Sequence, residues 1–188
     1  EPDVFIVSDH GYETIDSVID VHKELIAGGF NIEGDKNSVI VADNGGSVLF
    51  YITRTDNELS TRLLRWLSLQ KWVGSIATDI PQDTIAKFPT LSDIGLCGPR
   101  APLIAVTMRS SATGQIAPLA RSGTATGGIV GMGSHGGGSS AEMHNTLIAS
   151  GPSFKSDYCS NLPSGNVDIA PTTLHLLNIP VPDHFDGR

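Results

Sequence analysis

Residues 4–11 have the sequence Val4-Phe5-Ile6-Val7-Ser8-Asp9-His10-Gly11, in which an apolar run leads directly into a carboxylate, an imidazole and a glycine. Four consecutive apolar residues are typical of a strand that is buried on both faces of a parallel sheet. Open α/β sheets keep their binding sites at the carboxyl ends of such strands. The stretch therefore predicts an α/β fold with Asp9 and His10 at a strand end. Gly11 would permit the turn that brings both side chains onto one metal ion, although an ordinary loop with a helix-capping Asp has the same sequence.

A second candidate segment, Gly131-Met132-Gly133-Ser134-His135-Gly136-Gly137-Gly138, places His135 among glycines. Glycine allows close approach of the backbone and unusual backbone angles, which suits a ligand held against a cofactor or a phosphate. The alternative is a flexible surface loop, and for this segment taken alone that is the simpler interpretation.

Several stretches together resemble the type I phosphodiesterase/nucleotide pyrophosphatase family of the alkaline phosphatase superfamily. They cover both ends of the chain and leave a more variable middle. The matching stretches are 6–11, 133–136, 143–147, 151–154, 167–172 and 186–188.

The resemblance implies part of an alkaline-phosphatase-like α/β sandwich, with a mostly parallel sheet flanked by helices and a small α+β cap insertion. It also implies two zinc ions, with Asp9 and His10 on one ion and His135 on the other. Zinc accepts carboxylate and imidazole ligands, and a pair of ions assists in-line displacement at phosphorus. The implied function is hydrolysis of a phosphodiester or pyrophosphate bond in a nucleotide-like small molecule.

The chain departs from the family pattern ahead of residue 8. The family has an earlier Asp, a Ser or Thr nucleophile at a helix start and an Asp-x-x-x-His pair there, whereas Asp3 has no His four positions later. We therefore expect the carboxyl-terminal portion of a longer hydrolase, without catalytic residues of its own. By itself it should be inactive and bind zinc weakly or not at all. A phosphomonoesterase, sulfatase or phosphomutase of the superfamily, and a non-catalytic binding domain, are the alternatives.

Composition excludes several classes of protein. The 188 residues carry a net charge of −8, which argues against a basic surface that tracks a nucleic-acid backbone. No apolar run approaches the roughly 18 residues of a membrane span.

Cys97 and Cys159 either pair or are two buried thiols. The resemblance allows a periplasmic or extracellular location, which the residues themselves do not decide.

Periodicity and turn residues predict the secondary structure. We expect core segments at 1–29 and 131–188 and a cap-like insertion at 30–130. Helices are expected at 14–27, 57–70 and 168–177, strands at 3–8, 38–42, 47–53, 73–78, 103–108 and 146–149, and a loop at 110–126.

Other side chains have two interpretations each. His144 either orients a metal ligand by a hydrogen bond or is an ordinary core histidine. His22 is expected to pack against the sheet, and Asp168 to cap the last helix. Four aromatic residues of the insertion offer stacking surfaces for a base, although core packing explains them more simply. They are Tyr51, Trp66, Trp72 and Phe88.

The strand at 4–7 also predicts an assembly. If neighbouring strands precede this chain, the strand has an unpaired, apolar edge. Such an edge pairs readily with another chain. We expect it to be covered by the missing amino-terminal half or by self-association.

Overall fold

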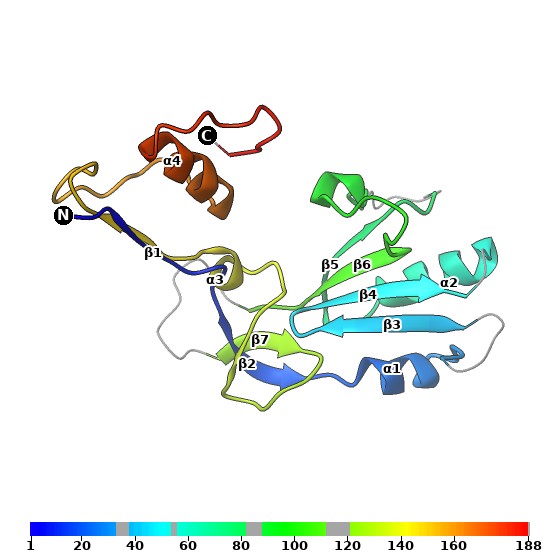
Figure 1. Cartoon of the computed structure of the whole chain (residues 1–188). Coiled ribbons are helices and arrows are strands. Elements are labelled where there is room, and N and C mark those ends of the chain that lie inside the picture. Colours follow the sequence, from blue (N-terminus) through cyan, green and yellow to red (C-terminus); the bar gives the residue numbers. More distant parts are fainter. Residues whose placement is uncertain (33–37, 54–55, 82–87, 112–120, 188) are drawn as a thin grey trace. The chain divides into compact units, whose positions relative to one another are not determined.

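The computed structural model describes residues 1–32, 38–53, 56–81, 88–111 and 121–187 (Figure 1). They form two compact units, which are described separately. The terminal unit comprises Glu1–Asp9 and Asn145–Arg188, and the central unit comprises His10–His144. The expected boundaries at 29/30 and 130/131 remain a prediction.

The largest sheet of the central unit is antiparallel. Its strand order is β3-β4-β6-β5, formed by β3 (Val39–Asn44), β4 (Ser47–Ile52), β6 (Ile104–Met108) and β5 (Val73–Thr78). Strands β3 and β4 form a hairpin, in which Asn44 pairs with Ser47 and leaves Gly45 and Gly46 as the turn. Gly45 has a φ of +61°, a value that favours glycine. The strands expected at 73–78 and 103–108 are confirmed.

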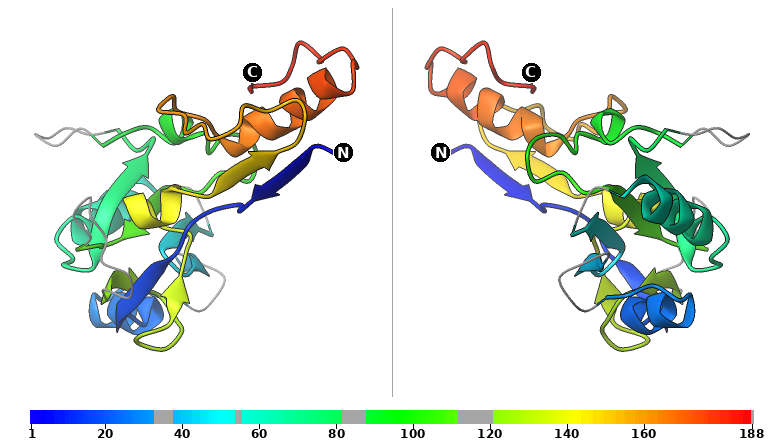
Figure 2. Two further views of the ribbon diagram at one scale, coloured as in Figure 1. Left: turned by 90° about the vertical axis from the view of Figure 1, so that its left-hand side faces the viewer. Right: turned by 90° about the vertical axis from the view of Figure 1, so that its right-hand side faces the viewer.

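Two helices cover one face of this sheet, which we call the helical face. They are α1 (Val21–Ala27) and α2 (Asn57–Leu67), and the side-on views of Figure 2 show α2 along the sheet. The α2 helix begins where the Asp56 carboxylate accepts the Leu59 N–H at 2.9 Å. The core between them contains Val21, Leu25, Leu59, Leu63, Leu67, Val48, Phe50, Ile76, Ile104 and Val106.

Alternate residues of the same strands form the opposite face of the sheet. There Leu49, Ala77 and Ala105 pack with Leu91 and Leu96. The last two flank a short 3₁₀ turn, η1 (Ser92–Ile94). No helix of the helical-face core contributes to this second cluster.

The expectation of a helix at 14–27 is wrong in its first half. Residues Glu13–Val18 form the strand β2, and α1 starts only after Asp20, whose carboxylate accepts the Lys23 N–H at 3.1 Å. Glu13 and Ile15 are buried two residues apart, which is strand periodicity. The β-branched residues here also fit a strand better than a helix.

The β2 strand lies between two other strands. It pairs in parallel with β7 (Arg121–Ala125) and antiparallel with β8 (Gly133–Ser134). The loop expected at 110–126 is therefore a strand over its last part, while 112–120 lie outside the described residues. Small residues such as Ser122 and Gly123 are typical of a loop. In the structure this segment is a strand because it pairs with β2.

In the terminal unit, β1 (Val4–Val7) pairs antiparallel with β9 (Leu147–Ser150). The unit continues through a 3₁₀ turn, η2 (Asn166–Asp168), into α4 (Ile169–Leu176). These elements confirm the strands expected at 3–8 and 146–149 and the helix expected at 168–177. Asp168 occupies the N-cap position of α4, but its side chain makes no capping bond to that helix, so the expected role as a cap is wrong in this respect. Its carboxylate instead accepts the Gly165 N–H at 2.8 Å.

The α/β class is confirmed, but the expectation of a mostly parallel sheet is wrong. Among the described strands, β2–β7 is the parallel pair, and the other pairings are antiparallel. An apolar run such as 4–7 indicates a tendency toward burial but not the direction of its partner. Within its unit, Ile6 of β1 remains 59% exposed, so burial on both faces is not observed there.

Two smaller expectations are also resolved. Cys97 and Cys159 are exposed free cysteines, so the interpretation as buried thiols is wrong. His22 is exposed on α1 and does not pack in the core.

Within the described ranges, every helix is too short or too polar to cross a bilayer.

Candidate functional site

The central unit brings His10 and His135 together through strand pairing. Glu13 of β2 lies opposite Ser134 of β8, so the residues just before β2 meet the residue just after β8. The imidazole rings of His10 and His135 are stacked, with centroids 4.1 Å apart and planes 19° apart. Two histidines far apart in the sequence therefore form one surface feature.

Tyr12 lies edge-on to both imidazoles. Its ring centroid is 5.1 Å from that of His10 and 5.5 Å from that of His135. The His10 Nδ1 is 2.8 Å from the Gly11 carbonyl oxygen, which can only accept a hydrogen bond. A hydrogen bond at this contact requires a proton on Nδ1 of His10.

A buried carboxylate fixes β2 beside this pair. Glu13 is 5% exposed and accepts hydrogen bonds from the hydroxyls of Ser110 and Ser122, the latter at 2.6 Å. Since Ser122 belongs to β7, these bonds tie together the two parallel strands. Glu13 is not identifiable from the sequence, because an isolated Glu in an amphipathic segment gives no signal of burial.

The glycine loop after His135 is packed against its own protein. The His135 carbonyl accepts the Gly46 N–H at 2.8 Å, and Gly137 donates to Glu142 Oε1 at 2.9 Å. A Cβ at Gly136 would lie 2.3 Å from the Asn44 carbonyl oxygen, and one at Gly46 would lie 2.4 Å from the Gly137 nitrogen. Contact with the β3–β4 turn thus accounts for these glycines, and the interpretation as a flexible loop is not supported.

Glu142 anchors the other side of the loop. It lies in α3 (Ser140–Met143), is 6% exposed and forms a capping box with Ser139. The Glu142 carboxylate therefore takes part in the capping box of α3 and also accepts the Gly137 N–H.

Gly11 is required by close approach to α3. Its N–H donates to the Glu142 carbonyl at 2.8 Å. A Cβ there would lie 2.0 Å from the Ala141 carbonyl oxygen and 2.4 Å from that of His144. His144 is the exposed C-cap residue of α3, so the interpretation as a core histidine is wrong.

Asp9, the remaining expected ligand, belongs to the terminal unit. It is exposed, and its carbonyl oxygen accepts a hydrogen bond from Asn166 Nδ2 at 2.5 Å. Within the part of the chain that the structure describes, no group of three or more His, Cys, Asp or Glu side chains has the arrangement of a metal site. The metal roles of Asp9, His10 and His135 remain predictions.

The stacked geometry limits how the two histidines can bind metal. Two nitrogens on one tetrahedral zinc would be about 3.3 Å apart with convergent lone pairs, since each bond is about 2.0–2.1 Å. Imidazole lone pairs lie in the ring plane, so rings 19° from parallel hold them in nearly parallel planes that do not converge on one ion. The donor set therefore fits two neighbouring ions, one per histidine.

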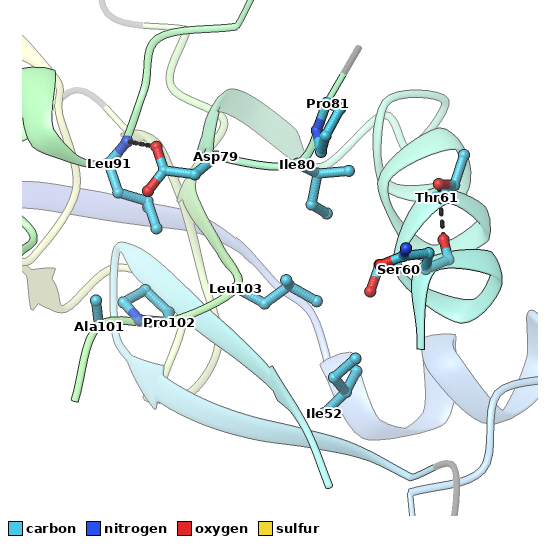
Figure 3. Close-up of a pocket in the computed structure, with 11 residues that line it drawn as sticks. Ile52, Ser60, Thr61, Asp79, Ile80, Pro81, Leu91, Ala101, Pro102 and Leu103 are labelled. Atoms are coloured by element: carbon cyan, nitrogen blue, oxygen red, sulfur yellow. Dashed lines mark hydrogen bonds between the residues drawn. The ribbon is translucent and has the colours of Figure 1, made fainter. Parts of the chain in front are cut away.

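A separate pocket of about 500 Å³ lies at the other end of the four-stranded sheet (Figure 3). Ser60 and Thr61 of α2 line it, together with Asp79, whose carboxylate accepts the Leu91 N–H at 3.0 Å. Asp79 is the charged residue among the described lining residues, so the pocket is unsuited to a phosphate.

The aromatic residues considered for base stacking are otherwise engaged. Trp72 is buried in the helical-face core, and Trp66 and Phe88 pack against that core. Tyr51 donates its hydroxyl to the Arg100 carbonyl at 3.2 Å. Core packing thus accounts for three of the four.

Comparisons of the chain with protein-family models, with curated protein sequences and with solved structures gave no match.

Proposed function

We propose that this chain is part of a metal-dependent hydrolase of phosphodiester or pyrophosphate bonds. In this proposal His10 and His135 each hold one of two neighbouring zinc ions, and Asp9 shares the ion of His10. The observation that carries the proposal is the stacked pair of imidazoles 4.1 Å apart. Its near-parallel rings suit two adjacent ions and do not suit one shared ion.

The surrounding residues support this role by positioning. The Gly11 carbonyl engages Nδ1 of His10, and Nε2 is the ligating atom in this proposal. Glu13 and Glu142 hold the two segments that carry the histidines. Zinc ions bound there would neutralise phosphate charge and lower the pKa of an attacking hydroxyl.

The net charge favours binding of the phosphate by metal ions over binding by basic side chains. The chain carries −8 overall, so a basic surface is a poor explanation for binding an anionic substrate. The hydroxyl nucleophile is expected on a segment ahead of Ser8, where the family pattern has it. The substrate is proposed to be a nucleotide-like or other small phosphodiester.

An assay with bis(p-nitrophenyl) phosphate and zinc tests the proposal. The 188-residue chain should give no turnover, whereas a protein in which the nucleophile segment precedes it should be active. In that longer protein, His10→Ala and His135→Ala should each reduce turnover by at least a hundredfold, and His22→Ala should leave it unchanged. Zinc-dependent turnover by the 188-residue chain itself, lost in Asp9→Ala, would show that the nucleophile has been misplaced.

A further inference from the structure

A pocket of about 560 Å³ lies on the face of the four-stranded sheet opposite the helical face. Strands β4, β5 and β6 form its floor, and Gly136–Gly138 form part of its wall. Gly136 follows His135 directly, and consecutive Cα atoms are about 3.8 Å apart. The pocket therefore begins one residue from the candidate metal centre.

The floor and mouth of this pocket are aliphatic. Leu49, Ala77 and Ala105 form the floor, and Ile94 and Met143 lie at the sides. Ile94 is 50% exposed and Met143 is 68% exposed. Large apolar side chains exposed around a concave apolar site are typical of a surface that binds an apolar group.

Polar residues also line the pocket, and two of them are paired with each other. The hydroxyls of Ser75 and Thr107 are 2.8 Å apart and bond to each other. Asp43 is the charged residue among the described lining residues, which include no Lys, no Arg and no aromatic ring. The pocket thus disfavours a phosphate and offers no stacking platform for a base.

We propose that this pocket binds the aliphatic group of a phosphoester whose phosphate lies at the His10–His135 pair. This inference rests on the proposed function and narrows its substrate class to phosphodiesters that carry a neutral alkyl group. The volume is within the range of about 300–1,000 Å³ that is usual for small-molecule sites.

Methyl NMR of the 188-residue chain tests the inference without an assay of activity. The probes are 1-butanol, 1-hexanol, n-butyl phosphate and n-hexyl phosphate, each with and without zinc. The methyl signals of Leu49, Ile94 and Met143 should shift, while those of Leu63 and Leu67 in the helical-face core should not. Affinity should rise about fifteenfold from the butyl to the hexyl probe, since each buried methylene contributes about fourfold.

The variant Ala105→Phe is designed to fill the pocket from its floor. It should weaken hexanol binding at least tenfold, whereas Ala27→Phe, on the exposed end of α1, should not. If Ala105→Phe does not fold, the pattern of shifted methyl groups in the unsubstituted chain still decides the question.

The outcomes separate this inference from the proposed function. Chain-length-dependent binding of both alcohols and phosphates would support the pocket, and the effect of zinc on the phosphates reports separately on the metal site. Zinc-dependent phosphate binding that is independent of alkyl length would support the metal site and overturn the pocket assignment. Shifts outside the pocket, or full binding by a folded Ala105→Phe, would overturn it as well.

Discussion

The imidazoles of His10 and His135 are stacked 4.1 Å apart because β2 and β8 pair next to them. The pairing depends on two buried carboxylates and on glycines at points of close backbone contact. Substitution of Gly11, Glu13 or Glu142 removes one of these interactions at a time.

Gly11→Ala should destabilise the protein by about 1–3 kcal/mol, because the added Cβ would overlap the carbonyl oxygens of Ala141 and His144. The measurement is the free energy of unfolding in urea. Gly127→Ala is the matched control, since no atom lies within 4 Å of a Cβ at that position. Its effect should be below about 1 kcal/mol. Equal stability of the two variants would contradict the assigned role of Gly11.

Glu13→Ala should lower the free energy of unfolding by about 1–3 kcal/mol, because the hydroxyls of Ser110 and Ser122 lose their shared acceptor. Glu13→Gln keeps an acceptor oxygen and should recover much of the loss. Denaturant titration of both variants measures the difference. If the Ala variant is as stable as the unsubstituted protein, the buried bonds do not hold β2 to β7.

The sequence could predict the elements whose signals are local. The Gly45-Gly46 turn and the apolar stripe of α2 are read within a few residues, and both are present. The β2 strand was missed because Ile15, Val18 and Ile19 run into the true helix at helical spacing. Asp20, a capping residue directly before Val21, was the signal that separates the two elements.

The candidate site was predictable only in part. His10 and His135 were identified from a family resemblance, and the structure places their rings in contact. Glu13 was not identifiable, because its partners Ser110 and Ser122 are 97 and 109 residues away in the sequence. The glycines after His135 suggested a ligand or a flexible loop, since no local pattern reports contact with the β3–β4 turn.

Glu142→Ala should loosen the loop that follows His135. The change removes the acceptor of the Gly137 N–H and the capping box of α3. Hydrogen exchange of the Gly137 amide should accelerate at least tenfold, because a bond to a charged acceptor contributes about 1.5–3 kcal/mol.

The control for this variant is Glu58→Ala, on the exposed first turn of α2. It should leave the Gly137 exchange rate unchanged. Unchanged exchange in Glu142→Ala as well would mean that the β3–β4 turn alone holds the loop.

The central claim is that His10 and His135 bind separate, neighbouring zinc ions. NMR of the histidine ring nitrogens during a zinc titration of the 188-residue chain tests it most directly. Binding should be weak, because two histidines leave each ion short of ligands. The claim predicts that both rings respond, and that His10→Ala removes its own response but leaves that of His135. Loss of both responses in His10→Ala would indicate one shared ion and would contradict the claim.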